Sequence, residues 1–305
     1  MDDDVNADVV CVASWNADLI SRVARPIARG ETLMASAFSI SPGGKGSNAA
    51  VAAARQGARV ALIARIGDDD FGRMGMALWH EEGIDTRHVE QAAGERSGVA
   101  QILVYEDGDN SIAVYPGAGT GLGARHAQAA ATLLAGCRVV MASCEVPAEA
   151  TLGAFRLARA AGALTLLNPA PARPLSDGLI ALVDVLTPNE SELYLLAGTA
   201  ASPDEAAARL LVRGARAVLV TLGAAGCRLY RAAQPPLTVP GRAMEVRDTI
   251  GAGDTFTGAL AAAMARGEPL PAAMRWANAA AALSVTQHGA IDGIPRLADV
   301  AALVG

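Results

Sequence analysis

Short apolar runs alternate along the chain with alanine-rich or amphipathic stretches. The apolar runs are rich in Val, Ile and Leu and too short for typical helices, so they predict buried strands. The expected strands cover 8–14, 60–67, 139–143, 163–168, 183–187 and 217–221. The expected helices cover 49–56, 68–80, 151–161, a stretch from 188 onward, 254–266 and 271–285. This alternation predicts an α/β fold with a doubly wound, mainly parallel sheet and helices on both faces.

Two stretches interrupt this alternation. Residues 19–40 contain a proline and a glycine and then alternate in polarity from Met34, which indicates strands rather than a helix. Residues 97–115 hold two apolar runs around a polar turn, which is typical of a β-hairpin. We expect insertions at about 16–41 and 97–115 to form a small β-sheet lid. The whole chain, 1–305, is expected to be one domain, because no repeat or low-complexity linker divides it.

Composition narrows the classes of partner. Hydrophobic residues make up 52% of the 305 residues, which favours packed helices over a disordered chain. The formal net charge of -6, without any Lys/Arg-rich run, argues against a nucleic-acid partner. The chain starts with Met1 and three aspartates where a secretory signal needs basic residues, and no apolar run reaches ~18 residues. We therefore expect a soluble, cytoplasmic protein without a membrane partner.

Cysteines and histidines are scattered. Neither type shows the close pairs of a zinc site, so we expect buried free thiols and no histidine-bound metal. The cysteines are Cys11, Cys137, Cys144 and Cys227, and the histidines are His80, His88, His126 and His288.

The stretch 247–258 is a loop that becomes a helix. Gly251 and Gly253 let a ligand approach the backbone, and free amides at a helix N-terminus attract phosphate. The charge of Asp254 would repel that anion, which makes sense if this carboxylate is a base for a substrate hydroxyl. The alternative is that Asp254 only stabilises the helix dipole.

A second glycine-rich loop, 41–48, precedes the helix expected at 49–56. It is not a P-loop, because the Walker pattern needs a longer gap before its Gly-Lys and a Ser or Thr directly after the Lys. Lys45 and Asn48 can bond hydroxyl groups, or the loop is a simple tight turn. Asn16 and Asp18 follow the first strand, where they either hold a polar substrate or form an Asx turn.

Seven segments, in this order, resemble the motifs of the ribokinase family, within the phosphofructokinase-B-type carbohydrate and nucleoside kinases. The resemblance covers nearly the whole chain. It implies a ribokinase-like fold and an ATP-dependent transfer of phosphate to the primary hydroxyl of a sugar, most closely D-ribose. The segments are 16–18, 43–48, 168–173, 187–190, 221–223, 248–249 and 251–256.

The resemblance also assigns residues. Asp254 matches the catalytic base, and the amides of Gly251, Ala252 and Gly253 match the anion hole. The positions similar to sugar-binding residues are Asn16, Asp18, Gly44, Lys45, Gly46, Ser47, Asn48 and Glu145. Those similar to ATP-binding residues are Asn189, Thr221, Leu222, Gly223, Ala224, Ala225, Gly226, Gly253 and Asn278. Three departures, Ala49 for Gln, Ser47 for Ala and Asn278 for His, leave the choice of sugar open.

The family uses metal ions as well. Glu192 matches an acidic residue linked to Mg²⁺ through water. The positions that match a K⁺ site, mostly through backbone carbonyls, are Asp248, Ile250, Ser284, Gln287, Gly289 and Gly293. Because carbonyl ligands leave little trace in side chains, the absence of a cation stays an alternative.

The sequence also bears on the oligomeric state, and it leaves two alternative functions open. An apolar face of the lid could pair with that of a second subunit, so we expect a homodimer. The protein could phosphorylate another sugar or a nucleoside, although the small side chains of Ala13 and Ala100, with Ile40, suggest a small ligand. A non-catalytic sugar-binding regulator is the alternative from another class, and the presence of Asp254 argues against it.

Overall fold

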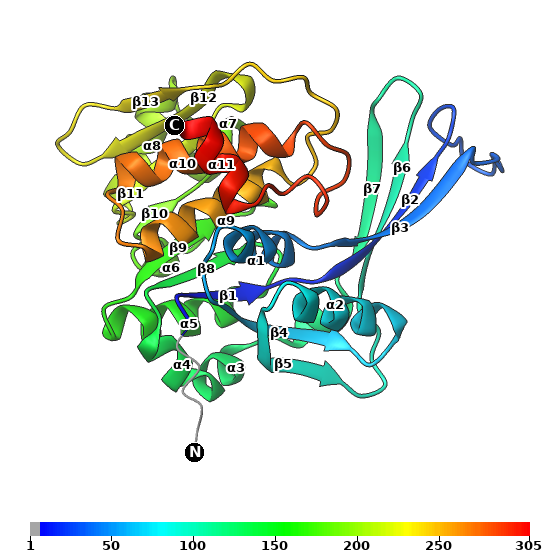
Figure 1. The fold of residues 1–305 in the computed structure, drawn as a ribbon, viewed down its shortest axis with the longest axis horizontal. Helices are drawn as coiled ribbons and strands as arrows, with labels where there is room; N and C mark the ends of the chain where they lie inside the picture. Colours follow the sequence, from blue (N-terminus) through cyan, green and yellow to red (C-terminus); the bar gives the residue numbers. More distant parts are fainter. Residues whose placement is uncertain (1–6) are drawn as a thin grey trace.

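The computed structural model describes residues 7–305, whose largest sheet has nine strands (Figure 1). In spatial order these are β13 (Leu237–Pro240), β12 (Gly226–Arg231), β11 (Ala217–Thr221), β10 (Val185–Leu186), β9 (Leu164–Asn168), β8 (Val139–Ser143), β1 (Val9–Ala13), β4 (Val60–Gly67) and β5 (Asp85–Ala92). The pairs β11–β12 and β12–β13 are antiparallel, whereas the other neighbours are parallel. The expected mainly parallel sheet is therefore confirmed.

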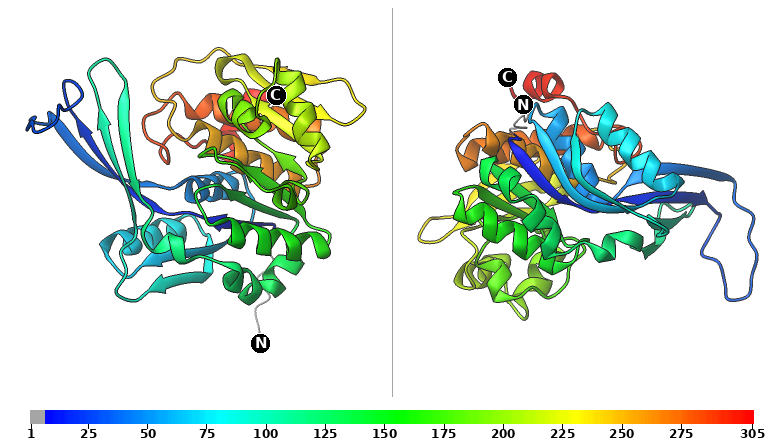
Figure 2. Two further views of the ribbon diagram at one scale, coloured as in Figure 1. Left: turned by 180° about the vertical axis from the view of Figure 1, so that it is seen from behind. Right: turned by 90° about the horizontal axis from the view of Figure 1, so that it is seen from below.

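Helices cover both faces of this sheet (Figure 2). Alternate residues of β1 show the two cores, because Cys11 packs in one hydrophobic cluster and Val10 and Val12 pack in the other. The Cys11 face is covered by α1 (Lys45–Arg55), α2 (Asp70–Glu81), α9 (Ala252–Ala265), α10 (Leu270–Ser284) and α11 (Leu297–Val304). The opposite face is covered by α3 (Ala124–Ala129), α4 (Ala131–Gly136), α5 (Ala148–Ala160), α6 (Asp177–Ile180), α7 (Glu190–Ala197) and α8 (Pro203–Val212).

A smaller sheet projects from the body and forms the lid (Figure 1). Its strands, in spatial order, are β3 (Ala37–Gly43), β2 (Asn16–Arg22), β6 (Gly98–Val104) and β7 (Asn110–Tyr115). The parallel pair β2–β6 joins the two insertions, and the connection between β2 and β3 lies at the far end of the sheet (Figure 2).

The structure corrects several predicted boundaries. The expected loop at 41–48 is reduced to Gly44, with a φ of 92°, because β3 continues to Gly43 and α1 already begins at Lys45. The polar alternation from Met34 becomes a strand only at Ala37, since Met34 is exposed and lies outside the sheet. The strand expected at 183–187 shortens to two residues.

Several elements were not predicted. The edge strand β5 is mostly polar, so its sequence lacks the apolar signal of a buried strand. The other unpredicted elements are α3, α4, α6, α8, α11, β12, β13 and the short 3₁₀ turns η1 (Gly117–Gly121) and η2 (Gly223–Ala225).

The four cysteines are free and buried, as expected. Burial raises the pKa of both Cys137 and Cys227 to about 12, which keeps these thiols protonated and unreactive near neutral pH. In the part of the chain that the structure describes, no helix is long and apolar enough to cross a membrane.

Helices α1 and α9 cross in direct backbone contact. A Cβ atom at Gly258 would lie 2.2 Å from the carbonyl oxygen of Ala49, so only glycine allows this approach. Both helices bury alanines at the crossing, including Ala52 and Ala262. The contact sets the distance between the two glycine-rich motifs, because each motif lies at the N-terminus of one of these helices.

We therefore expect Gly258→Ala to lower the free energy of unfolding by about 1–3 kcal/mol, the usual cost of overpacking a rigid contact. Urea unfolding followed by circular dichroism measures this change. Gly136→Ala is the matched control, because a Cβ there has no neighbour within 4 Å among the described residues. Equal stability of the two variants would contradict the close crossing.

Candidate active site

The site lies where the strand order reverses. From β1 the chain continues through the lid to β4 on one side, whereas β8 pairs with β1 on the other side. Ligands in open α/β sheets bind at such a switch point, outside the carboxyl ends of the strands. Asn16 follows β1 and Glu145 follows β8, so both predicted residues lie at this point.

Asp254 is held in the first turn of α9 and is only 4% exposed. The Asn48 amide Nδ2 donates to its Oδ2 at 2.9 Å, and the Asn168 amide Nδ2 donates to its Oδ1 at 3.5 Å. Burial raises the pKa of the Asp254 carboxyl to about 6, while Lys45 and the bond from Asn48 oppose this rise. The carboxylate is thus ionised at neutral pH yet basic enough to accept a proton.

Asn168 was not predicted as a site residue. It ends β9, is buried, and its side-chain oxygen also accepts from the Ala170 N–H at 3.2 Å. The signal in the sequence was its place in the 168–173 segment, which carried the resemblance but no assigned role. Its amide binds the carboxylate oxygen of Asp254 that Asn48 does not bind.

Glu145 caps the N-terminus of α1. Its Oε2 accepts from the Lys45 N–H at 2.8 Å and from the Ser14 hydroxyl at 2.6 Å, and Ser14 Oγ accepts in turn from the Gly46 N–H. A carboxylate at a helix N-terminus is stabilised by the free amides and the dipole. The unpredicted Ser14 therefore joins β1, α1 and the segment after β8 at the centre of the site.

Two of the predicted sugar-binding residues play other parts. The Ser47 side chain is fully buried, and its hydroxyl accepts from the Trp79 indole N–H at 2.8 Å, so it faces the core and not the site. Its amide donates to the Ser14 carbonyl oxygen. Gly46 has its amide bound to Ser14, and a Cβ there would lie 2.6 Å from the Ala13 Cα, so Gly46 serves close packing.

Lid glycines make room for Asn16 and Asp18. A Cβ at Gly98 would lie 2.2 Å from Asn16 Oδ1, and a Cβ at Gly43 would lie 2.2 Å from Asp18 Oδ1. The two polar side chains share one face of β2, opposite these glycines on the neighbouring strands. Burial, reinforced by the charge of Glu145, raises the pKa of Asp18 to about 7.

Lys45 lies among these acidic groups. Its pKa is raised, chiefly by the charge of Asp254 and then by Glu145 and other carboxylates, while burial opposes the rise. The ammonium group therefore stays charged and partly neutralises the carboxylates around it. The charge of Glu192, in α7, also raises the pKa of Lys45.

Apart from Gly253 in α9, the predicted ATP-binding residues gather around the carboxyl end of β11. Asn189 forms a parallel bridge with Thr221, and η2 follows directly. Asn278 from α10 donates to the Pro240 carbonyl oxygen at 3.0 Å, and Pro240 pairs with Gly226. The turn from Leu222 through Ala224 and Ala225 is closed by the bond from the Leu222 N–H to the Gly226 carbonyl oxygen.

Glu192 forms a capping box with Asn189. Its Oε2 accepts from the Asn189 N–H at 2.9 Å, while the Asn189 side chain accepts from the Glu192 N–H at 2.8 Å. The capping box thus holds the Asn189 and Glu192 side chains together at the start of α7. One carboxylate oxygen is thereby committed to the helix start.

The predicted K⁺ positions surround the start of α9. Asp248 accepts from the Gly289 N–H and the Ile250 N–H, both at 2.9 Å. A Cβ at Gly293 would lie 2.6 Å from the Ser284 carbonyl oxygen and 3.0 Å from that of Gly289, so these two oxygens converge. Gln287 is exposed, in the turn between them.

The geometry defines the class of protein. A buried carboxylate beside the amide-rich N-terminus of a helix, with polar side chains from a lid opposite, is the arrangement of an enzyme that transfers a phosphoryl group to a hydroxyl. Comparison with known proteins agrees, since the profile of the pfkB family carbohydrate kinases matches residues 6–297. The chain belongs to the pfkB family of carbohydrate kinases, phosphotransferases with an alcohol group as acceptor.

Individual relatives are similar over nearly the whole chain. A ribokinase of Haemophilus influenzae is 36% identical over 288 residues, 93% of this chain and 94% of that protein. A deoxyribokinase of Salmonella typhi is 36% identical over 295 residues, 95% of this chain and 96% of that protein. The Arabidopsis thaliana ribokinase complexed with ribose and ATP aligns with a TM-score of 0.92 at 31% identity, covering 98% of each chain. The ribokinase-like fold is thereby confirmed.

The raised pKa of Asp254 predicts the pH dependence of catalysis. A base must be deprotonated, so kcat/KM for the sugar should fall as the pH drops through about 6. Removing the bond from Asn48, which favours the ionised form, should move this acid limb of the profile to higher pH in Asn48→Ala. Steady-state kinetics from pH 5 to pH 8, roughly the range in which such groups titrate, measure both profiles.

Two controls separate Asp254 from other effects. Burial raises the pKa of Asp18 to about 7, so the limb near 6 should persist in Asp18→Asn if it belongs to Asp254. Asn110→Ala changes an exposed asparagine at the start of β7 and should leave the profile in place. An unshifted limb in Asn48→Ala would contradict the assignment.

Proposed function

We propose that the protein is an ATP-dependent kinase that converts D-ribose into D-ribose 5-phosphate. The observation that carries the proposal is the buried Asp254 carboxylate at the N-terminus of α9, facing polar lid residues across the switch point. The ribokinase relatives support ribose as the sugar. Body and lid would work together as one kinase domain.

Asp254 acts as the base. It accepts the proton of the 5-hydroxyl while that oxygen bonds to the γ-phosphorus of ATP, and the bond from this phosphorus to the bridging oxygen breaks, which releases ADP. Asn48 and Asn168 hold the carboxylate in place from opposite sides. Burial makes this carboxylate a stronger base, because the neutral carboxyl group loses less hydration free energy than the carboxylate when it is buried.

The amides of Gly251, Ala252 and Gly253 stabilise the charge of the transferred phosphoryl group. First-turn amides have no acceptor within the helix, so they can face an anion. A Cβ at Gly253 would have no neighbour within 4 Å among the described residues, which leaves space for a ligand there. Ala252 makes only a long bond, 3.3 Å, from its N–H to the Thr249 carbonyl oxygen.

Sugar recognition comes from the lid face and α1. Asn16 and Asp18 bond sugar hydroxyls, and Lys45 adds a charged donor beside Asp254. Gly44 lets the sugar approach the backbone, while Asn48 offers its buried Oδ1, which lacks a partner in the described structure. Glu145 contributes chiefly by fixing the first turn of α1.

ATP binds along the edge formed by Asn189, Thr221, the 222–226 turn and Asn278. The oxygen chemistry of Glu192 suits a hydrated Mg²⁺ ion, and the carboxylate oxygen outside the capping box would hold it through water. Bound Mg²⁺ neutralises phosphate charge. Glu192 itself fixes the start of α7 through its capping box with Asn189.

The donor set around Gly293 fits a monovalent cation such as K⁺. The carbonyl oxygens of Ser284 and Gly289 converge where a larger side chain would fill the space, and Asp248 adds a nearby negative charge. Ile250, Gln287 and Gly293 would complete the site through their carbonyl oxygens. This loop contacts the anion hole, because a Cβ at Gly251 would lie 3.0 Å from the Ala290 side chain.

The lid suggests a homodimer. Phe38, Ile40 and Tyr115 lie on the face opposite Asn16 and Asp18 and are 63%, 48% and 60% exposed. A second copy of this lid would bury them. Light scattering at assay concentrations should give twice the chain mass, and a monomer mass would contradict the proposal. A cytoplasmic location fits the use of ATP and the free thiols.

ADP release in the presence of ATP and Mg²⁺ tests the function. The panel contains ribose, 2-deoxyribose, fructose and nucleosides, each with and without KCl. We expect the highest kcat/KM for ribose and a rise on addition of K⁺ but not of a matched NaCl concentration. A preference for 2-deoxyribose, which the deoxyribokinase relatives make the main competitor, or for a nucleoside would contradict ribose as the substrate. No release with any acceptor would contradict the kinase itself.

Asp254→Asn should keep ribose binding yet lose at least ~10²-fold in turnover, the usual scale for removal of a general base. It should also raise the stability at pH 7. The pKa of Asp254 in the folded protein lies above its ordinary value of 3.8, so the folded state favours the protonated carboxyl group. Stability is therefore lost as the pH rises through about 6 and this buried group ionises. The free energy of unfolding should increase by about 3 kcal/mol at pH 7 and much less at pH 4.

Calorimetric titration measures ribose binding, steady-state kinetics measure turnover, and urea unfolding measures stability. Asp299→Asn is the control, because Asp299 is an exposed acid that caps α11 far from the switch point in sequence. Full turnover, or lower stability than the parent protein at pH 7, would contradict the role of Asp254 as a buried base.

A further inference from the structure

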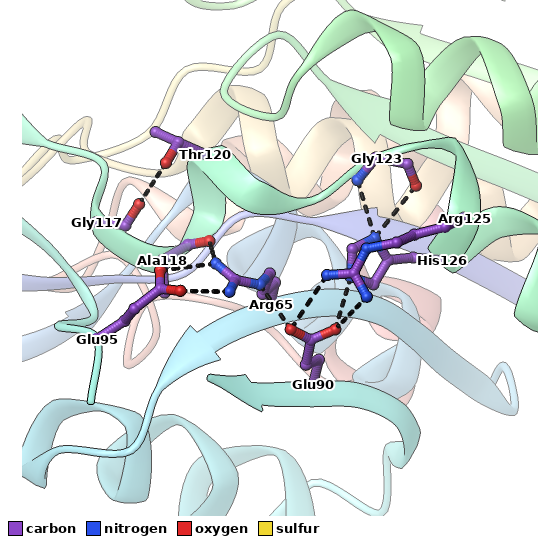
Figure 3. Close-up of polar contacts among 9 residues, drawn as sticks. All are labelled: Arg65, Glu90, Glu95, Gly117, Ala118, Thr120, Gly123, Arg125 and His126. Atoms are coloured by element: carbon purple, nitrogen blue, oxygen red, sulfur yellow. Dashed lines mark hydrogen bonds and ion pairs between the residues drawn. The ribbon is translucent and has the colours of Figure 1, made fainter. Parts of the chain in front are cut away.

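Both connections of the β6–β7 hairpin to the body meet at one largely buried arginine side chain (Figure 3). Arg65 lies near the end of β4, and its side chain is only 10% exposed. Its guanidinium group donates to both carboxylate oxygens of Glu95, which precedes β6, and to the Ala118 carbonyl oxygen, which follows β7. The distances from Nη1 are 2.8 Å to Glu95 and 2.6 Å to Ala118.

The two connections also bond each other. The Ala118 N–H donates to the Arg96 carbonyl oxygen at 2.8 Å. Gly117 has a φ of 53°, and a Cβ there would lie 2.4 Å from the same oxygen, so the crossing requires glycine. Gly121 lies against the arginine, since its Cβ would be 2.4 Å from Arg65 Nη1. Arg65 is therefore enclosed by the backbone that it binds.

Neighbouring residues of β4 and α2 complete the attachment. Ser97 is fully buried; its hydroxyl donates to Asp69 Oδ1 at 2.7 Å and accepts from the Gly67 N–H at 3.0 Å. Asp69 in turn caps α2 by accepting from the Gly72 N–H. The segment that enters the lid is thus fixed at Glu95 and at Ser97, directly before β6 begins.

A third set of bonds fixes the segment after η1. Arg65 Nε donates to Glu90 Oε1 at 2.8 Å, and Glu90 also binds Arg125 and His126 from α3 (Figure 3). The bond from Arg65 lowers the pKa of Glu90 to about 2, so the pair stays ionised under assay conditions. The bidentate contact of Arg65 with Glu95 gives geometric specificity as well as strength.

This attachment leads directly to the sugar site. Gly98 follows Ser97 and pairs with Asn16, and a Cβ at Gly98 would lie 2.2 Å from Asn16 Oδ1. Ala100, two residues further on, pairs with Asp18. A shift of the 95–97 segment would therefore move β6 against the two lid residues that face Asp254.

We propose that Arg65 is a positioning residue for sugar binding: it holds both connections of the β6–β7 hairpin and so fixes Gly98 and Asn16 relative to α1 and α9. The inference rests on the proposed sugar kinase activity and deepens it. Arg65 touches neither ATP-binding candidates nor Asp254, so its effect should fall on the sugar and not on ATP.

Kinetics and hydrogen exchange of Arg65→Met test this inference. We expect the KM for ribose to rise at least ~10-fold, because small misplacements of binding groups are costly, while the KM for ATP stays within about twofold. Amides of β6 and β7 should exchange at least ~10-fold faster, while those of β9 and β11 keep the parent rate. Arg65→Lys restores the charge but not the fork of donors, so it should recover only part of the ribose KM.

Two further variants keep the test decisive. Glu95→Gln weakens the ion pair between Arg65 and the exposed Glu95 side chain. It should show the same pattern more weakly, and it keeps the test valid even if Arg65→Met does not fold. Arg59→Met is the control: it removes a bidentate ion pair with Asp8 directly before β4 begins. Its KM values and exchange rates should match those of the parent protein. An unchanged ribose KM in Arg65→Met, or equal increases of the ribose and ATP KM values, would overturn the inference. Failure of the parent protein to phosphorylate ribose would instead contradict the proposed function.

Discussion

A carboxylate kept ionised in a buried place is the constraint on which this structure depends. Asp254 is removed from water at the crossing of α1 and α9, and only two amides and the charge of Lys45 offset the cost of its burial. Those partners come from two elements, α1 and β9, so the fold must hold both in register with α9. The backbone contact at Gly258 and the capping of α1 by Glu145 do this.

The same constraint explains the acidic surroundings. Asp18, Glu145 and Glu192 all act on Lys45, and such a cluster of negative charge would be unfavourable in a site that bound only an anion. It suits a site where a neutral sugar loses a proton to one carboxylate while helix amides, on the opposite side, receive the phosphoryl group. In the proposed function the lid has two tasks, since it would present Asn16 and Asp18 to the sugar and exclude water that would hydrolyse ATP.

Local patterns in the sequence predict the parts of this arrangement that are themselves local. Apolar runs give β1, β4, β8, β9 and β11, and the glycines around Gly44 and Gly251 mark both helix starts. Contacts between distant residues could not be predicted in this way. The first turn of α1 forms at Lys45 because Glu145, 100 residues later, caps it, and Ser47 faces the core because Trp79 lies there. Asn168 and Arg65 are each a single polar residue near the end of an apolar run in the sequence. Their partners are distant in sequence and are brought to them only by the fold.

Phosphorus NMR of the product formed from ATP and D-ribose tests the central claim most directly. If Asp254 activates the primary hydroxyl, the new phosphate monoester lies on a CH₂ group, so its ³¹P resonance should be a triplet from coupling to two protons. It should appear with the parent protein and be nearly absent with Asp254→Asn at equal ribose saturation. A doublet, which marks a phosphate on a secondary carbon or on the anomeric carbon, or an equal triplet with Asp254→Asn, would contradict the account.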